Sequence, residues 1–301
     1  MNRFAALFVI LAASLWGFDG IALRPSLYTL PVPLVVFIET TIVALVLSPF
    51  FIKRLGELKK LHTKDWLAFL AVALTGGAIG TMAITKALFY VGFVNLSIVV
   101  LIQKLQPVFA ISLAAVMLKE HLPKAFFAWA GLAIVGAYFM IFGFGLPNFE
   151  TGDKTIIASI YALIATLAFA MSTVFSKRAI RHVDYKMSTY LRFVLTAMVM
   201  LIVSSITTDI QKVGMVSNDQ WLIFLLIVFA SGGPAIFLYY YGLKQISASV
   251  ATICELAFPL TAVVLEYFIH GKLMELPQWF GVAVLIFSII RVSKFHLTNK
   301  A

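Results

Sequence analysis

Long apolar runs alternate with short polar connections along almost the whole chain. Ten of these runs reach roughly 17–25 residues, the length needed to cross the hydrocarbon core of a bilayer. They are apolar on all faces and not on one stripe only, so they predict helices surrounded by lipid and protein. We expect the helices at 4–24, 31–52, 66–91, 96–118, 124–143, 156–176, 187–207, 220–243, 248–269 and 277–295. The connections between them leave no room for a separate soluble domain.

The composition narrows the class of protein further. Hydrophobic residues make up 62% of the chain and charged residues only 12%, whereas a soluble domain is about half apolar and a quarter charged. We therefore expect an all-α integral membrane protein with several spans. Residues 1–24 have the basic start and apolar core of a signal peptide, but they also contain Trp16 and Asp19. Cleaved signal peptides rarely contain such residues, so we expect a retained first helix.

The net charge of +10 is unevenly distributed between the two predicted sides of the membrane. Most Lys and Arg residues fall on one side, as in 53–64, 177–186 and 291–300. The other side holds only Arg24, Lys154, Lys212 and Lys272. This is the positive-inside pattern, which predicts that both termini are cytoplasmic and that the helices are even in number. The charge thus orients the chain in a cell (inner) membrane, and no nucleic-acid partner is needed to explain it.

The two halves of the chain resemble each other at an offset of about 152 residues. Trp66 corresponds to Trp221, TGGAIG at 75–80 to SGGPAI at 231–236, and Ser97–Pro107 to Ser249–Pro259. We therefore predict two repeats, 1–145 and 154–296, each with five helices. An odd number of helices inserts the second copy upside down. The corresponding loops agree, because 53–65 is basic whereas 208–219 has one lysine. Inverted repeats are an architecture of secondary transporters, with the substrate site near the bilayer midplane.

Several short motifs carry a resemblance to a known family. They are Trp16-Gly17, Arg192-Phe193, Ala87-Leu88, Gly242-Leu243, Leu105-Gln106-Pro107, Ala257-Phe258-Pro259, Lys119-Glu120-His121-Leu122 and a Trp-x-Gly motif in each half. With these motifs the chain resembles the EamA-type transporters of the drug/metabolite transporter superfamily. The resemblance implies ten helices in two EamA-like repeats and a carrier or exporter of small metabolites, amino acids included. The chain departs from the family pattern at Glu39-Thr40, at Gly271-Lys272 and in about three extra residues near 92–95.

Charged residues inside the predicted helices are the main clue to a site. Each costs about 2.5–3.5 kcal/mol to insert near the bilayer centre, so they usually face a wet cavity or pair with one another. The acids are Asp19, Glu39 and Glu255, and the bases are Lys86, Lys104 and Arg192. They either line a cavity that binds a polar substrate or form buried pairs that fix helix packing. Acids at this depth could also carry a coupling proton, because desolvation disfavours their charged form.

The predicted substrate-binding residues include most of these charges together with neighbouring amide and aromatic groups. They are Trp16, Asp19, Glu39, Lys86, Gln103, Lys104, Tyr240 and Glu255. Pro107 and Pro259 break helical hydrogen bonding and predict a hinge or kink in each of two corresponding helices. Gln103 maps onto Glu255 across the repeat, beside Lys104. Lys104 and Glu255 therefore either line the transport path or pair with each other and hold it shut.

No motif for catalysis, metal or nucleotide binding occurs. GxxxxGK[ST], HExxH and GxSxG are absent, and Cys254 is the only cysteine. We expect no catalytic residue, metal or cofactor, and no enzyme. The sequence predicts a secondary active transporter of a small polar metabolite, such as an amino acid or another zwitterion, that works by alternating access. Protons are a candidate coupling ion, and both a monomer and a homodimer are compatible with the sequence. A multidrug efflux carrier for apolar or cationic compounds is the alternative.

Overall fold

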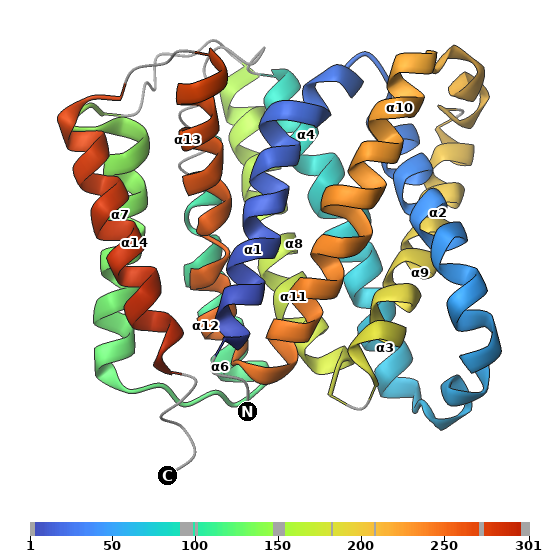
Figure 1. Ribbon diagram of the computed structural model, residues 1–301, viewed down its shortest axis with the longest axis horizontal. Helices are drawn as coiled ribbons and strands as arrows, with labels where there is room; N and C mark the ends of the chain where they lie inside the picture. Colours follow the sequence, from blue (N-terminus) through green and yellow to red (C-terminus); the bar gives the residue numbers. More distant parts are fainter. Residues whose placement is uncertain are drawn as a thin grey trace.

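The computed structural model describes residues 4–90, 99, 102–146, 154–181, 183–207, 209–270 and 274–295, and within these ranges it contains helices and no strand (Figure 1). The longer α-helices of the first half are α1 (Ala5–Phe18), α2 (Val32–Phe51), α3 (Thr63–Val72), α4 (Gly80–Tyr90), α6 (Gln106–Met117) and α7 (Lys124–Phe142). Those of the second half are α8 (Lys154–Ala179), α9 (Tyr185–Ile206), α10 (Asn218–Ile227), α11 (Gly233–Gln245), α12 (Ala248–Cys254), α13 (Ala257–His270) and α14 (Leu276–Ser293).

Nine helical segments in the described part of the chain are long and apolar enough to cross a membrane. They are Ala5–Leu27, Val32–Lys59, Thr63–Ala87, Lys124–Phe142, Ile156–Ala179, Tyr185–Ile206, Asn218–Gln245, Ala248–Leu265 and Leu276–Ser293. Each coincides with one of the predicted stretches. The remaining prediction, 96–118, lies partly outside the described residues, and its later part forms the short apolar helix α6. The chain is thus a multi-pass membrane protein.

Three of the spans contain a π-helical turn, at Asp19–Leu23, Ala73–Ile79 and Val228–Gly232. The second turn contains both glycines of the pair Gly76-Gly77, and the third ends at Gly232, the first glycine of the corresponding pair. A Cβ at Gly76 would collide with Ser172 of α8, and a Cβ at Gly77 would collide with Thr196 of α9. The small residues therefore allow close packing of the span against α8 and α9. Such π-turns are frequent at functional sites because they re-aim neighbouring side chains.

Two further helices are broken just before a proline. Lys104 and Leu105 form a turn after which α6 begins, with Pro107 in its first turn. Glu255 and Leu256 form the corresponding turn between α12 and α13, ahead of Pro259. Proline has no N–H and its ring clashes with the carbonyl four residues earlier, which explains why a continuous helix does not form here.

The helices pack in pairs that join the two halves of the chain. α7 packs along α14, α2 along α9, α1 along α11, α4 along α8, and α6 against α12. The α7–α14 pair, on the left in Figure 1, is very close because Gly281 lies against the backbone of Met140 and Gly136 against that of Leu285. The start of α1 and the end of α14 lie at the same end of the bundle, the lower end in Figure 1.

Candidate functional site

A cavity of about 930 Å³ lies between the two halves of the chain. All three π-turns and every α-helix named above except α3 and α10 contribute to its wall. The cavity therefore collects polar side chains from the places where the helices are interrupted. Among the described residues, no group of three or more His, Cys, Asp or Glu side chains is arranged to hold a metal ion.

Most of the predicted site residues lie around this cavity. Its wall includes Trp16, Asp19, Glu39, Gln103, Lys104, Pro107, Glu255 and Pro259. Lys86 and Tyr240 do not contribute to it. Lys86 is exposed on α4, with its ammonium 5.7 Å from the centre of the Tyr161 ring. Tyr240 is fully buried behind the wall, where its hydroxyl lies 3.2 Å from Ser176 Oγ.

Two of the acids share one arginine. Arg24 Nη2 lies 2.6 Å from Asp19 Oδ2 and 3.2 Å from Glu39 Oε2, and Arg24 Nε donates to Asp19 at 3.1 Å. The π-turn explains the first pairing, because its i→i+5 hydrogen bonding sets the side chains of residues 19 and 24 over each other. The sequence assigned Arg24 to an outer loop. In the structure it belongs to the cavity wall, where it neutralises one of the two carboxylates.

Glu255 is held by neutral donors from three other helices. Its Oε1 accepts from Tyr239 Oη at 2.7 Å and from Thr173 Oγ1 at 3.3 Å. Its Oε2 accepts from Gln106 Nε2 at 3.1 Å. Gln106 follows the helix break of the first half and Glu255 lies in that of the second, so this bond joins the two breaks directly.

Lys104 differs from the other charges of the wall because no described residue pairs with it. Its side chain is 9% exposed and lines the cavity, yet it has no hydrogen bond or ion pair with any described residue. The hypothesis that Lys104 pairs with Glu255 is therefore wrong for this conformation, since Glu255 bonds to Gln106, Thr173 and Tyr239 instead. The hypothesis that both residues line the path agrees with their positions.

Arg192 is the third cation of the cavity wall. Its guanidinium lies 5.7 Å from the centre of the Tyr240 ring and donates one long hydrogen bond, 3.4 Å, to the Tyr240 hydroxyl. A guanidinium has five N–H donors, so most of them are left for water or for a bound molecule. The buried Tyr240 thus positions Arg192 from behind.

One wall of the cavity is aromatic. The Trp16 and Tyr239 rings lie 5.3 Å apart, and Trp16 Nε1 donates to the Ser231 carbonyl at 3.1 Å. That bond fixes the indole in the wall. Phe169 and Phe258 add further ring surface. The cavity therefore offers flat apolar faces beside its charged groups, a combination typical of sites for small organic molecules.

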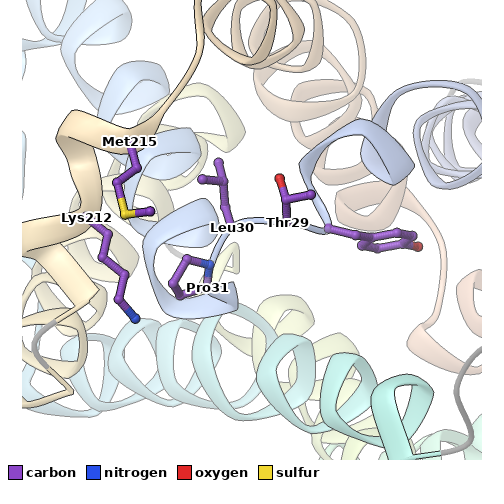
Figure 2. Close-up of a pocket in the computed structure, with 6 residues that line it drawn as sticks. Thr29, Leu30, Pro31, Lys212 and Met215 are labelled. Carbon is purple, nitrogen blue, oxygen red and sulfur yellow. The ribbon is translucent and has the colours of Figure 1, made fainter.

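A smaller pocket of about 440 Å³ adjoins the cavity, with Tyr28 and Leu30 in the walls of both. Figure 2 shows Lys212 and Met215 on one side of it and Leu30 and Pro31 on the other. Partial burial opposes ionisation of Asp209, but hydrogen bonds from Lys212 and Thr207 outweigh it and lower the pKa of Asp209. Asp209 thereby holds Lys212 at 2.9 Å at the edge of the pocket.

Sequence reasoning missed the residues that complete the hydrogen bonds of the site. Gln106 and Tyr239 were recognisable in part, since Gln106 belongs to the polar turn at 103–107 and Tyr239 to the run at 239–241. Thr173 gave no signal, because a threonine in an apolar helix is common. Arg24 was the clearest omission, and its spacing of five residues from Asp19 is informative only once the π-turn is known.

Comparisons with known proteins find transporters among the relatives of this chain. The EamA-like transporter family matches residues 3–142 and again 156–294. A protein of Fusobacterium nucleatum named riboflavin transporter ImpX is 43% identical over 97% of this chain and 98% of its own. The uncharacterized transporter YwfM of Bacillus subtilis is 25% identical over 96% of this chain and 93% of its own. A solved crystal structure with 15% sequence identity has a TM-score of 0.76, covers 100% of both chains and supports the fold.

Proposed function

The chain belongs to the EamA-like transporter family, and on that premise we propose that it carries riboflavin across the membrane. One observation supports this cargo above all: the relative named riboflavin transporter ImpX is 43% identical along nearly the full length of both chains. Riboflavin is a small polar metabolite, the class that the sequence predicts, but it is neutral and not zwitterionic.

The cavity is suited to such a molecule in size and in chemistry. Its volume of about 930 Å³ falls within the range of roughly 300–1,000 Å³ found for small-molecule sites. Riboflavin joins a flat aromatic ring system to a chain of hydroxyl groups. Trp16, Tyr239 and Phe258 supply surfaces on which a flat ring can stack. The hydroxyls of Ser172 and Thr173 supply partners for the polyol.

A zwitterion such as an amino acid is the second candidate cargo. Lys104 and Glu255 favour it, because the cavity contains an anion and a cation that do not pair with each other. A multidrug carrier, by contrast, is expected to have an aromatic cavity with one unpaired acid. The several charges in this wall make that alternative weaker.

We propose alternating access between two inverted repeats, 1–145 and 154–296, as the transport mechanism. Exchange of the halves maps α1 onto α8 and the α3–α4 span onto the α10–α11 span. The contacts α1–α11 and α4–α8 are then equivalent, while α2–α9 and α7–α14 map onto themselves. Both halves contribute to the cavity wall, so a rocking motion of one against the other would expose it on alternate sides. The basic loops favour cytoplasmic termini in the cell (inner) membrane.

Transport of riboflavin by purified protein in liposomes tests the cargo directly. We expect saturable uptake of radiolabelled riboflavin that exceeds the leak of protein-free liposomes about tenfold or more. Excess unlabelled riboflavin should compete, whereas a mixture of amino acids and a panel of apolar cations should not. Riboflavin uptake no faster than the leak, with saturable uptake of a labelled amino acid by the same liposomes, would favour the zwitterion; the same failure with uptake of a labelled apolar cation would favour the multidrug alternative. Either result would refute riboflavin as the cargo.

A further inference from the structure

We propose that Lys104, Gln106 and Glu255 form a subsite that recognises the pyrimidinedione edge of a flavin through its imide N–H and the two flanking carbonyls. This inference rests on the proposed function and specifies the part of the cargo that these residues recognise. The pyrimidinedione edge presents an acceptor, a donor and an acceptor in sequence. A complementary wall must offer a donor, an acceptor and a donor.

Glu255 supplies the acceptor. A carboxylate has about four lone-pair positions, and three are occupied by Tyr239, Thr173 and Gln106. Two of these bonds go to Oε1, whereas Gln106 is the one described residue that donates to Oε2. One position on Oε2 therefore remains for a donor in the cavity. An imide N–H fits that position, and a carbonyl or ether oxygen does not.

Gln106 supplies one of the two donors. Its Nε2 uses one hydrogen for the 3.1 Å bond to Glu255 Oε2, and its second amide hydrogen has no described partner. The free hydrogen lies beside the free lone pair of Glu255, because one bond joins the two groups. The pair thus presents a donor next to an acceptor, which matches a carbonyl next to an N–H.

Lys104 supplies the other donor, and its position is the strongest evidence for the subsite. Its buried ammonium lines the same cavity, two residues before Gln106, and has no described partner. Burial of an ammonium is costly unless an acceptor meets it. A flavin carbonyl provides such an acceptor without adding a net charge. The subsite thus explains why a carrier of a neutral molecule would keep a lone cation at the helix break.

Two flavins that differ at one nitrogen test the subsite. Riboflavin and 3-methylriboflavin share both carbonyls, the aromatic ring and the polyol, but the methyl group removes the imide N–H. Affinity is measured from quenching of flavin fluorescence by the purified protein in nanodiscs. We expect the native protein to prefer riboflavin by about 10- to 100-fold, because the bond lost is one to a carboxylate.

The variants separate the roles of the residues. Glu255→Gln should reduce the preference to within about threefold, because the amide no longer offers an anionic acceptor. Lys104→Met should weaken binding of both flavins by a similar factor, about tenfold or more, since both keep the carbonyls. Lys104→Gln retains a donor and should restore part of that loss. The control Lys186→Met changes a lysine on an exposed position of α9 and should alter neither affinity.

The outcomes distinguish this inference from the proposed function. If the native protein binds riboflavin and 3-methylriboflavin equally, the subsite is wrong while riboflavin transport stands. If riboflavin binds selectively but Lys104→Met, in protein that elutes as a single folded species, leaves its affinity unchanged, the role of Lys104 is wrong. If neither flavin binds and neither is transported, the proposed function fails and the subsite fails with it.

Discussion

Arg24 holds the two neighbouring acids of the cavity unequally. It makes two bonds to Asp19, the shorter of them 2.6 Å, but only one contact of 3.2 Å to Glu39. One guanidinium cannot neutralise two carboxylates, so ionisation of both acids leaves the cluster with one uncompensated negative charge. Glu39 is the less supported of the two and is therefore the better candidate for carrying a coupling proton.

Transport against pH tests this assignment. If a proton accompanies the cargo, uptake by the native protein should rise as the pH falls, because the protonated carrier is the competent form. Glu39→Gln mimics that form permanently, so its uptake should change at least about fivefold less across the same pH range. Uptake is measured in proteoliposomes at several pH values, with the same pH on both sides of the bilayer.

Asp19→Asn is the matched comparison. Asp19 is held tightly by Arg24, so this variant should keep the native slope of uptake against pH even if its overall rate is lower. An unchanged slope in the Glu39→Gln variant as well would contradict the assignment. The slope must then be followed in Glu255→Gln, the remaining acid of the cavity wall.

For single residues, the sequence predicts which charges lie at the cavity but not which groups they bond to. The cost of burying charge in a membrane directs attention to Asp19, Glu39, Lys104 and Glu255, and all four lie in the cavity wall. Their hydrogen-bond partners depend on local backbone geometry, which the hydrophobic pattern of the sequence does not predict. Arg24 reaches Asp19 through a π-turn, and Gln106 reaches Glu255 because two helix breaks meet.

At the scale of helices, two charged side chains, Lys177 and Glu120, hold the connection between α11 and α12. We call their hydrogen bonds to this connection the clasp. Lys177 of α8 donates to the carbonyls of Leu243 and Ile246 at 2.6 and 2.5 Å. Glu120, beyond the end of α6, accepts from the backbone N–H of Ala248 at 2.7 Å and from Ser249 Oγ at 2.6 Å. A carboxylate at a helix N-terminus and a cation at a C-terminus both complement the helix dipole.

Glu120 joins the first half of the chain to the second at this point. The residue before it, Lys119, has a φ of 55°, a left-handed conformation that is uncommon outside glycine. That turn directs the carboxylate onto α12, the helix that ends at Cys254 and leads into Glu255. In the proposed alternating access, we expect the cavity to open at this end by separation of α12 from α6, which would break the clasp.

Loss of the clasp should make α12 open more often. Cys254 is a natural probe, since it is a free and fully buried thiol at the end of this helix. In the Glu120→Ala variant we expect Cys254 to react with a membrane-permeant maleimide about 5- to 10-fold faster, because several hydrogen bonds that hold α12 are lost. Mass spectrometry of the intact protein measures the rate.

Glu275→Ala provides the control. Glu275 stands at the N-cap position of α14, so its replacement removes a carboxylate from another helix N-terminus without touching α12. Its labelling rate should equal that of the native protein. Equal acceleration in both variants would indicate general loosening of the bundle, and no acceleration in Glu120→Ala would show that the clasp does not limit the opening.

Elements were predicted where length and apolarity decide them. The helices at 124–143 and 277–295 are recovered within a few residues as α7 and α14. Their close packing was less predictable. Gly131 and Gly281 occupy matching positions of the Trp-x-Gly motif, yet a Cβ would meet the backbone of Met140 at Gly281 and nothing within 4 Å at Gly131. The repeated Trp-x-Gly motif alone does not predict which of its two glycines packs against a neighbouring backbone.

For the whole molecule, the cavity extends to the end of the bundle that is opposite the clasp. The cavity wall includes Phe142 at the end of α7 and Gln278 near the start of α14, which lie away from the end shared by the chain's termini (Figure 1). Glu120 and Lys177 bond near the start of α12, toward the end of the termini. With both termini in the cytoplasm, as proposed, this conformation faces outward.

The orientation with both termini in the cytoplasm is inferred from the distribution of Lys and Arg and can be tested directly. Single cysteines are introduced at two exposed positions of a Cys254→Ser variant. Gln211→Cys lies near the smaller pocket, and Lys59→Cys lies in the basic connection after α2. Intact cells are then treated with a membrane-impermeant maleimide. We expect Gln211→Cys to react and Lys59→Cys to react only after the cells are permeabilised, because basic loops are retained in the cytoplasm. The reverse pattern would place this end of the cavity on the cytoplasmic side. It would change the side from which the proposed cargo enters, but not the contacts proposed for the subsite. Labelling of both positions in intact cells would mean that the chain inserts in two orientations, in which case the positive-inside bias is too weak to set its topology.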